Sequence, residues 1–301
     1  MIYRGRFAPT PSGPLHAGSL LTALASYLQA RAVAGQWLLR IDDLDRARCR
    51  PEHTDTILRQ LEAHGLYWDA APRLQSQHVD EYAAAYEQLL AQGLVYGCAC
   101  ARAQLAQTSR SGVDGPVYAG TCRDQAKDLR SAAVRLRVAA IELQIDDACQ
   151  GRLRRQLERD VGDFIVRRAD GQIAYQLACV IDEQQQGITE VVRGADLIGS
   201  SFKQRYLRQL LDLAQPAYLH IPVLVDAQGQ KLSKQNHAAS IDAYSVVDNL
   251  FACLSRLGQQ PPASLRQAGA AEILQWATVG WTLRQVPQLT RLPAPADVGA
   301  W

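Results

Sequence analysis

Two short segments, far apart in the chain, contain the residue types that bind the phosphates of a nucleotide. The first, Arg6–Leu21, reads RFAPTPSGPLHAGSLL and places two glycines, a histidine and a serine where a strand turns into a helix. The second, Lys231–Asn236, reads KLSKQN and places two lysines on a loop. Backbone N–H groups and the positive dipole end of a helix N-terminus attract anions. We therefore predict one ATP site built from both segments, although each segment alone is a weak signal.

The residues of these segments predict specific roles in activating a carboxylate. Gly18 has no side chain and lets a ligand approach the backbone. His16 can donate hydrogen bonds to phosphate oxygens as charge develops, and Lys231 and Lys234 can stabilise the leaving pyrophosphate. We predict His16, Gly18, Lys231 and Lys234 as catalytic residues, and ATP contacts from His16, Gly18, Ser19 and Lys234. Attack of a carboxylate on the α-phosphate needs positioning and charge stabilisation, and no side-chain nucleophile.

The distribution of basic residues supports this interpretation. The chain has 32 basic and 30 acidic residues, a balance too even to indicate nucleic-acid binding. Lysine is rare, and two of the four lysines fall within one four-residue stretch: Lys127, Lys203, Lys231 and Lys234. A compact ammonium group is therefore favoured at that place, where arginine is otherwise the usual base. Chance in an arginine-rich chain is the alternative.

Length and composition restrict the class of protein. The 301 residues, of which 48% are hydrophobic, can form one large domain with one or two small ones. No run of 18 apolar residues predicts a membrane span, and the N-terminus lacks the apolar stretch of a secretory signal. Seven cysteines, an odd number, argue against a disulfide framework. We expect a cytoplasmic protein with no membrane partner.

Hydrophobic periodicity predicts an α/β protein. A strand over residues 2–8, a Pro/Gly loop, a helix over 18–33 and a strand over 36–42 are typical of half a Rossmann-like fold. A strand pattern also returns at residue 163 and continues past a turn at 170–171 to Ile173 and beyond. The other expected helices cover 51–64, 79–92, 200–213 and 240–257, and the other strands cover 133–139, 164–168, 189–193 and 218–225.

The segments RFAPTPSGPLHAGSL, RIDDLD and KLSK resemble the signatures of the glutamyl-tRNA synthetase group of class I aminoacyl-tRNA synthetases. The resemblance implies a Rossmann-like catalytic domain that uses ATP with Mg²⁺, carries a zinc-binding insertion and ends in a short helical segment. Ser19 replaces the last histidine of the first signature, and this group often has a small residue there. The expected divisions are 1–96, 97–162, 163–238 and 239–301, with the insertion second and the helical segment last.

Charge complementarity predicts a glutamate pocket. Arg6 and Arg193 can each bind a carboxylate with a planar fork, and Tyr175 can add a hydroxyl. Asp42, at the carboxyl end of the second strand, can pair with the ammonium, although many relatives carry glutamate there. Arg193 implies glutamate because the glutamine-specific relatives lack this arginine. The resemblance adds the backbone of Phe7, Ala8, Pro9 and Thr10. Structural ion pairs are the alternative role for each arginine.

A cysteine cluster predicts a zinc site. Cys98, Cys100 and Cys122 supply three thiolates, and zinc prefers four ligands in a tetrahedron. The resemblance implies Tyr118 as the fourth ligand. The alternative is three buried cysteines without a metal.

Only 67 residues follow Lys234, too few for the large anticodon-reading domains of a full synthetase. The chain thus resembles the short glutamyl-queuosine tRNA(Asp) synthetases, which lack the anticodon-binding domain. These enzymes activate L-glutamate without tRNA and transfer it to queuosine in the anticodon loop of tRNA(Asp). Two alternatives stay open: a truncated glutamyl-tRNA synthetase that charges a tRNA 3′ end, and a catalytically silent RNA-binding paralogue.

Overall fold

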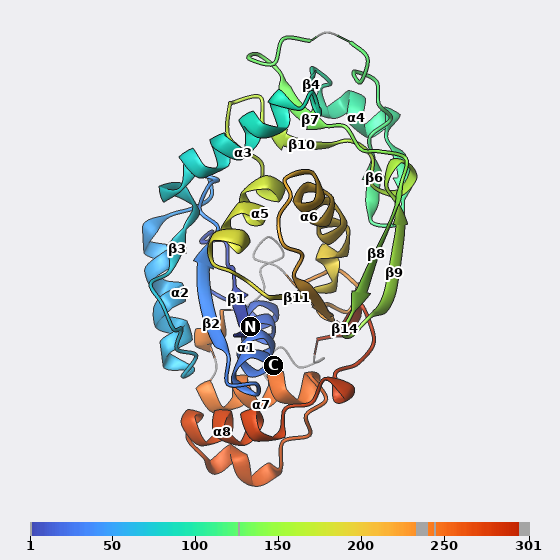
Figure 1. The fold of residues 1–301 in the computed structure, drawn as a ribbon. Helices are drawn as coiled ribbons and strands as arrows, with labels where there is room; N and C mark the ends of the chain where they lie inside the picture. Colours follow the sequence, from blue (N-terminus) through green and yellow to red (C-terminus); the bar gives the residue numbers. More distant parts are fainter. Residues whose placement is uncertain (1, 126, 233–239, 244, 295–301) are drawn as a thin grey trace.

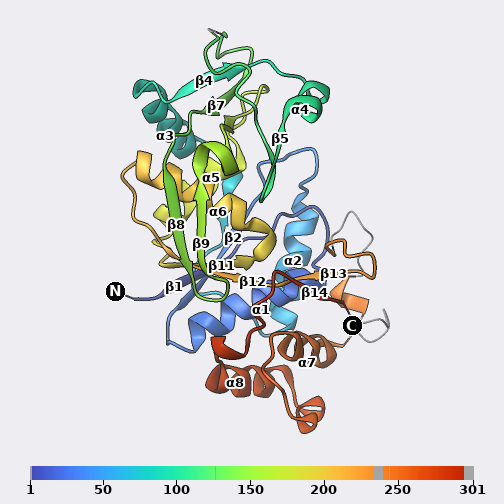
Figure 2. The same cartoon turned by 90° about the vertical axis from the view of Figure 1, so that its right-hand side faces the viewer.

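The computed structural model describes residues 2–125, 127–232, 240–243 and 245–294. The molecule is elongated (Figures 1 and 2). A small antiparallel sheet lies at one end, helices α7 and α8 lie at the other, and a mixed α/β body lies between them. Among the described residues, no helix is both long enough and apolar enough to cross a membrane.

The first half of the body is a parallel unit. Strand β1 (Arg4–Phe7) pairs with β2 (Gln36–Ile41), and β2 pairs with β3 (Arg73–Leu74). Helix α1 (Ala17–Arg31) connects β1 to β2 and buries its leucines and alanines in the core, as the periodicity predicted. Helices α2 (Pro51–Ala63) and α3 (Val79–Ala91) also form where the pattern predicted helix, and α2 begins at a proline, which suits a first helical turn.

The second half forms a four-stranded sheet, the central sheet, in the order β11-β12-β8-β9. Strand β11 (Glu190–Gly194) runs parallel to β12 (Ala217–Ile221), which runs parallel to β8 (Glu142–Asp147). Strand β9 (Gly151–Gln156) closes the edge antiparallel to β8. The Thr189 N–H donates to the Arg4 carbonyl at 3.0 Å, which places β1 beside the start of β11. Along the chain, helix α6 (Ile198–Leu210) connects β11 to β12, and β13 (Val223–Val225) follows β12.

Helix α5 (Tyr175–Gln185) corrects one expectation. The sequence pattern predicted strand from Ile173 onward, and this prediction is wrong. The buried residues Leu177, Ala178, Val180 and Ile181 recur at helical spacing, and they pack in the core that α6 shares. A short apolar run is ambiguous between a buried strand and a buried helix, and here the helix forms.

The small sheet combines residues from several parts of the chain. Strands β4 (Val95–Cys98), β7 (Ala133–Leu136) and β10 (Phe164–Arg167) form it in the order β10-β7-β4. Helix α4 (Arg102–Thr108) and the hairpin of β5 (Arg110–Gly112) and β6 (Gly115–Val117) lie nearby (Figure 2). Strands β8 and β9, within 97–162, extend the central sheet instead. The division of the chain into four regions stays a prediction.

The C-terminal part is mostly helical. Helix α7 (Val246–Arg256) begins at Ser245, whose hydroxyl accepts a hydrogen bond from the Asp248 N–H at 3.1 Å. Helix α8 (Ala270–Gly280) packs with α7 against α1, and the three share one hydrophobic core. The chain then returns to the body, where β14 (Arg291–Pro293) pairs with β13.

Candidate functional site

A cleft of about 410 Å³ opens at the carboxyl ends of β1 and β11, where parallel sheets bind ligands. It brings together most residues that the sequence predicted for ATP and glutamate. The predicted residues that line it are Arg6, Phe7, Ala8, Pro9, Thr10, His16, Gly18, Ser19, Tyr175, Arg193 and Lys231. Asp42 does not line it, and Lys234 lies outside the described residues.

The histidine turn is held by the start of α1. His16 is the N-cap residue, and its carbonyl accepts hydrogen bonds from the N–H groups of Ser19 (2.8 Å) and Leu20 (3.0 Å). A Cβ atom on Gly18 would lie 3.2 Å from Cε1 of His16, closer than ordinary van der Waals contact. Glycine therefore leaves room for the imidazole beside the first helical turn.

The lysine loop reaches the same cleft by way of β13. The Leu232 N–H donates to the Leu224 carbonyl at 2.8 Å, which fixes Lys231 at the cleft. Lys231 Nζ lies 2.5 Å from Asp196 Oδ2, so the lysine is paired with a carboxylate that also lines the cleft. Further on, the Ile241 N–H donates to the Leu15 carbonyl at 3.1 Å. The histidine turn therefore lies beside the chain that resumes at residue 240, and Lys231 lines the same cleft.

Gln60 of α2 contacts both the histidine turn and the chain from residue 240, and no motif in the sequence indicated this role. Its Oε1 accepts from the Leu15 N–H at 2.7 Å, while its Nε2 donates to Ser240 Oγ at 3.1 Å and Asp242 Oδ2 at 2.5 Å. The side chain is buried. One amide thus connects the histidine turn to the chain that follows the lysine loop.

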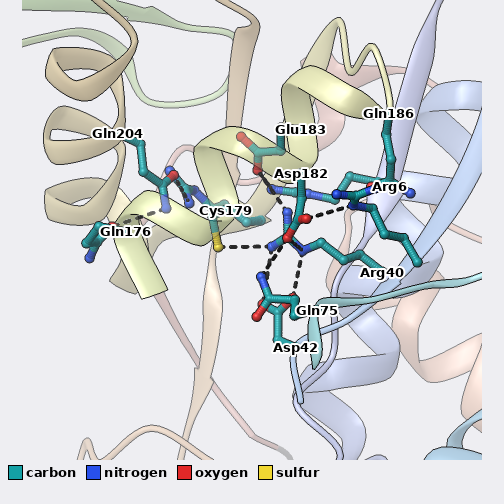
Figure 3. A network of polar contacts seen from close by, with 12 residues as sticks. Arg6, Arg40, Asp42, Gln75, Gln176, Cys179, Asp182, Glu183, Gln186 and Gln204 are labelled. Atoms are coloured by element: carbon teal, nitrogen blue, oxygen red, sulfur yellow. Dashed lines mark hydrogen bonds and ion pairs between the residues drawn. The ribbon is translucent and has the colours of Figure 1, made fainter. Parts of the chain in front are cut away.

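Arg6 belongs to a buried ionic network beneath the cleft (Figure 3). Its Nη2 lies 2.8 Å from Glu183 Oε1, and its Nη1 donates to the Val192 carbonyl at 3.0 Å. The other Glu183 oxygen pairs with Arg208 at 3.0 Å. Burial favours the neutral acid, but the charges of Arg6, Arg208 and Arg40 outweigh it and lower the pKa of Glu183 to about 2. Glu183 is therefore ionised and fixes the position of Arg6.

Asp42 is bonded to Arg40 on the same strand. Arg40 Nε lies 2.6 Å from Oδ1 of Asp42, and Nη2 lies 3.2 Å from Oδ2. Figure 3 shows this pair facing Cys179 and Asp182 of α5. Burial raises the pKa of Asp42 despite the Arg40 charge. Arg40, a charged residue within the apolar run QWLLRI, lines the cleft where Asp42 does not. The ammonium-binding role of Asp42 stays a prediction.

Arg193 ends β11 and is 4% exposed. Its Nη1 donates to Gln204 Oε1 at 2.8 Å, its Nη2 donates to Ser201 Oγ, and its Nε lies 3.4 Å from His220 Nε2. All three partners are uncharged side chains, and the sequence analysis identified none of them. Among the described residues, no carboxylate oxygen lies within 4.0 Å of this guanidinium, so its charge is available to an anion in the cleft.

The thiols of Cys98, Cys100 and Cys122 converge, as the spacing predicted, and their sulfurs lie within 4.8 Å of one another. The Cys100 and Cys122 sulfurs are 3.5 Å apart, and Tyr118 Oη lies 3.5 Å from Cys98 Sγ and 3.6 Å from Cys100 Sγ. A tetrahedral zinc with Zn–S bonds of about 2.3 Å needs sulfurs roughly 3.8 Å apart. Three thiols and a phenol at these separations fit such an ion.

The environment of Cys98 favours its thiolate, whereas the pKa of Cys100 is raised, chiefly by burial. Burial raises the pKa of Cys98, but hydrogen bonds with Tyr118 and Arg135 outweigh this effect and lower the pKa to about 7. The Arg135 guanidinium also lies 3.7 Å from the centre of the Tyr118 ring. The other four cysteines, Cys49, Cys149, Cys179 and Cys253, carry free thiols.

Comparison with known proteins identifies the family. Residues 3–278 match the family model described as "tRNA synthetases class I (E and Q), catalytic domain". This chain belongs to that family. The α/β class I synthetase fold expected from the sequence is therefore confirmed.

Individual relatives agree with this assignment. The chain is 48% identical to the glutamyl-Q tRNA(Asp) synthetases of Pseudomonas aeruginosa strain PAO1 and Thiobacillus denitrificans, with 97% of each chain covered. It is 47% identical to that of Methylococcus capsulatus, with 99% of this chain and 96% of the relative covered. Among solved structures, a glutamate-tRNA synthetase from Elizabethkingia anophelis superposes with a TM-score of 0.79 at 22% identity, covering 99% of this chain and 69% of that one. At 22% identity, this similarity shows that the two proteins share a fold.

Proposed function

We propose that this synthetase activates L-glutamate with ATP and then transfers it to queuosine in the anticodon loop of tRNA(Asp). One observation carries the proposal: the histidine turn, Lys231 and three buried arginines line a single cleft at the carboxyl ends of β1 and β11. Relatives that match the chain over nearly their whole length are named glutamyl-Q tRNA(Asp) synthetases, which supports the same substrates.

In this proposal the cleft binds the ATP phosphates and a glutamate carboxylate at different residues. The α1 N-terminus with His16 and Gly18 receives the ATP phosphates, and Ser19 of the first turn adds a hydroxyl. Lys231 and Lys234 act on the pyrophosphate side, and Mg²⁺ accompanies the nucleotide. Arg193 receives a carboxylate of glutamate because, within the described part of the chain, its hydrogen-bond partners are uncharged side chains.

The remaining pocket residues orient glutamate. Arg6 contributes positive charge to the lining of the cleft, although Glu183 already pairs with it. Tyr175, at the first turn of α5, brings its hydroxyl to the cleft, and the Phe7 to Thr10 backbone forms the floor. Asp42 contributes the negative charge that the ammonium requires.

The reaction proceeds in two steps. A glutamate carboxylate oxygen attacks the α-phosphorus, a P–O bond to pyrophosphate breaks, and glutamyl adenylate forms. A nucleophilic group of queuosine then attacks the activated carbonyl and AMP leaves. The protein's contribution to the first step is to hold the two reactants in line and to stabilise the charge on the departing phosphates.

We also propose that Cys98, Cys100, Tyr118 and Cys122 hold a zinc ion. The ion would connect β4 to the segment that precedes β7. Its role here is structural, since the cluster lies in the small sheet and none of its residues lines the cleft.

A transfer assay tests the proposal. Radiolabelled glutamate and ATP are supplied with three RNAs: tRNA(Asp) with queuosine, tRNA(Asp) without it, and tRNA(Glu). We expect label only on the first, and we expect it to survive removal of the 3′ terminal adenosine. Label on unmodified tRNA(Glu), lost with that adenosine, would instead identify an enzyme that charges the 3′ end.

A further inference from the structure

Three buried residues connect Arg193 to the far edge of the central sheet. They are Ser201 on α6, His220 on β12 and Asp147 at the end of β8. Ser201 and His220 are fully buried and Asp147 is 6% exposed. None of the three lines the cleft, whereas Arg193 does. Any influence on a bound ligand must therefore pass through Arg193.

The ring of His220 is fixed in one tautomer by Asp147. Nδ1 of His220 lies 2.6 Å from Asp147 Oδ2, and the His220 backbone N–H also donates to this carboxylate at 3.1 Å. A carboxylate only accepts hydrogen bonds, so Nδ1 carries the proton and Nε2 presents a lone pair. Burial, with help from the charge of Arg193, lowers the pKa of His220 although the hydrogen bond to Asp147 opposes this shift. The imidazole is therefore neutral.

The lone pair of Nε2 orders the groups around Arg193. Ser201 Oγ lies 2.6 Å from Nε2, so the hydroxyl donates to the ring and keeps its own lone pairs for Nη2 of Arg193. Nε of Arg193 faces the same ring nitrogen at 3.4 Å. The hydrogen bonds thus run in one direction, from Arg193 to Ser201, to His220 and to Asp147. A guanidinium has donors only: Nη2 meets the Ser201 hydroxyl and Nη1 meets Gln204 Oε1, while Nε lies beside the lone pair that the Ser201 hydroxyl uses.

Asp147 is itself anchored by backbone. Its Oδ1 accepts hydrogen bonds from the N–H groups of Cys149 at 3.0 Å and Gln150 at 2.8 Å, in the turn between β8 and β9. Burial would raise the pKa of Asp147, but these bonds and His220 outweigh it and lower the pKa. Oδ1 therefore binds the turn between β8 and β9, and Oδ2 binds the imidazole of His220.

We propose that Asp147, His220 and Ser201 are positioning residues that hold the Arg193 guanidinium in the orientation that receives a glutamate carboxylate. The inference rests on the proposed function, because it needs glutamate as the ligand of Arg193. An Asp–His–Ser series also occurs in hydrolases, where the serine is the nucleophile. Here the Ser201 hydroxyl is inaccessible and bonded to a guanidinium, so no substrate carbonyl can reach it.

Asp147→Asn is the discriminating variant. The backbone donors keep the amide oxygen at the Oδ1 position, which places the amide N–H₂ against Nδ1 of His220. The ring must then shift its proton to Nε2, which turns a donor toward Arg193 and Ser201. Asp146→Asn is the matched control, because Asp146 is the adjacent residue on β8, is solvent-exposed and bonds to Arg152 and Gln144 at the surface.

Kinetics of glutamate-dependent exchange of pyrophosphate into ATP provide the first test. We expect Asp147→Asn and Ser201→Ala to raise the KM for glutamate about 10- to 100-fold, since a hydrogen bond to a charged group is lost, and to change the KM for ATP less than twofold. Ser201→Thr, which restores the hydroxyl, should recover most of the affinity. Folded variants with unchanged KM for glutamate, or with equal rises for both substrates, would overturn the proposal.

Nitrogen NMR of the histidine rings provides a test that does not depend on activity. We expect the His220 ring, assigned by its loss in His220→Gln, to carry its proton on Nδ1 in the parent and on Nε2 in Asp147→Asn. A His220 ring that carries its proton on Nε2 in the parent would refute the proposed series of hydrogen bonds, even if the enzyme is active. If the parent shows this tautomer but no glutamate-dependent exchange, the proposed function fails and the ligand assigned to Arg193 fails with it.

Discussion

Arg6 and Glu183 form a buried ion pair, with 2.8 Å between Nη2 and Oε1, although the two residues are 177 positions apart in the chain. Oε2 of Glu183 pairs with Arg208 at 3.0 Å, and Nη1 of Arg40 lies 3.6 Å from Oε1. Three guanidiniums therefore surround one carboxylate beneath the cleft, and Asp42 and Asp182 also pair with Arg40. This arrangement allows a positively charged pocket to exist in the core of the fold.

The network predicts a specific dependence of stability on pH. Because the folded pKa of Glu183 is about 2, below its ordinary value of 4.5, its contribution is complete above pH 4.5 and is lost as the pH falls toward 2. We expect Glu183→Gln to reduce the free energy of unfolding by roughly 3 kcal/mol at pH 7. The difference from the parent should shrink between pH 4.5 and 3 in urea unfolding experiments. A difference that stays constant over this range would contradict the assignment.

Lys231→Ala should slow adenylate formation. The ammonium faces the cleft from the lysine loop and is held by Asp196 at 2.5 Å, so its removal takes away charge stabilisation of the leaving pyrophosphate. We expect a fall of about 10²-fold in the exchange rate at saturating substrates. Lys127→Ala is the control, because this exposed lysine lies outside the cleft. An equal effect of both substitutions would argue against the role of Lys231.

Asp42→Asn separates two roles of this carboxylate. If Asp42 pairs with the substrate ammonium, the variant should bind glutamate at least 10-fold more weakly yet bind glutarate, which has no ammonium, as well as the parent does. Because Arg40 loses a buried partner, we also expect unfolding to become easier by about 1–3 kcal/mol. Binding of both ligands is measured by calorimetry. Parallel weakening of glutamate and glutarate would show that Asp42 acts only through Arg40.

Metal content tests the cysteine cluster. We expect about one zinc per chain by elemental analysis, and a lower melting temperature after treatment with a chelator. Tyr118→Phe keeps the ring beneath Arg135 but removes the oxygen donor, so it should retain zinc less tightly than the parent. Cys253→Ser serves as the control thiol, since this buried residue lies in another core. A folded, zinc-free parent would exclude the site.

The sequence was sufficient for elements whose pattern is local. Helix α1 and strand β2 follow directly from their apolar spacing, and the carboxyl ends of β1 and β11 meet where parallel strands must meet. The pattern was insufficient for α5, because its short apolar run fits a buried strand as well as a helix. Because α5 was predicted as a strand, the contacts that its side chains make with Arg6 and Arg40 could not be predicted.

Residues that support the site could not be predicted for a different reason. Glu183, Gln60 and His220 act through partners distant in sequence, and only the tertiary fold brings them together. Single buried polar residues in a sequence carry no periodic signal. By contrast, His16 and Lys231 belong to recognisable segments. The residues that line the cleft could therefore be predicted, whereas the buried residues that support them could not.

The most direct test is exchange of labelled pyrophosphate into ATP by the purified chain, measured without tRNA for each of several amino acids. The account predicts exchange with L-glutamate and little with L-glutamine or L-aspartate, and loss of the glutamate response in Arg193→Gln. Exchange that is absent with glutamate, or equally strong with glutamine, would contradict it.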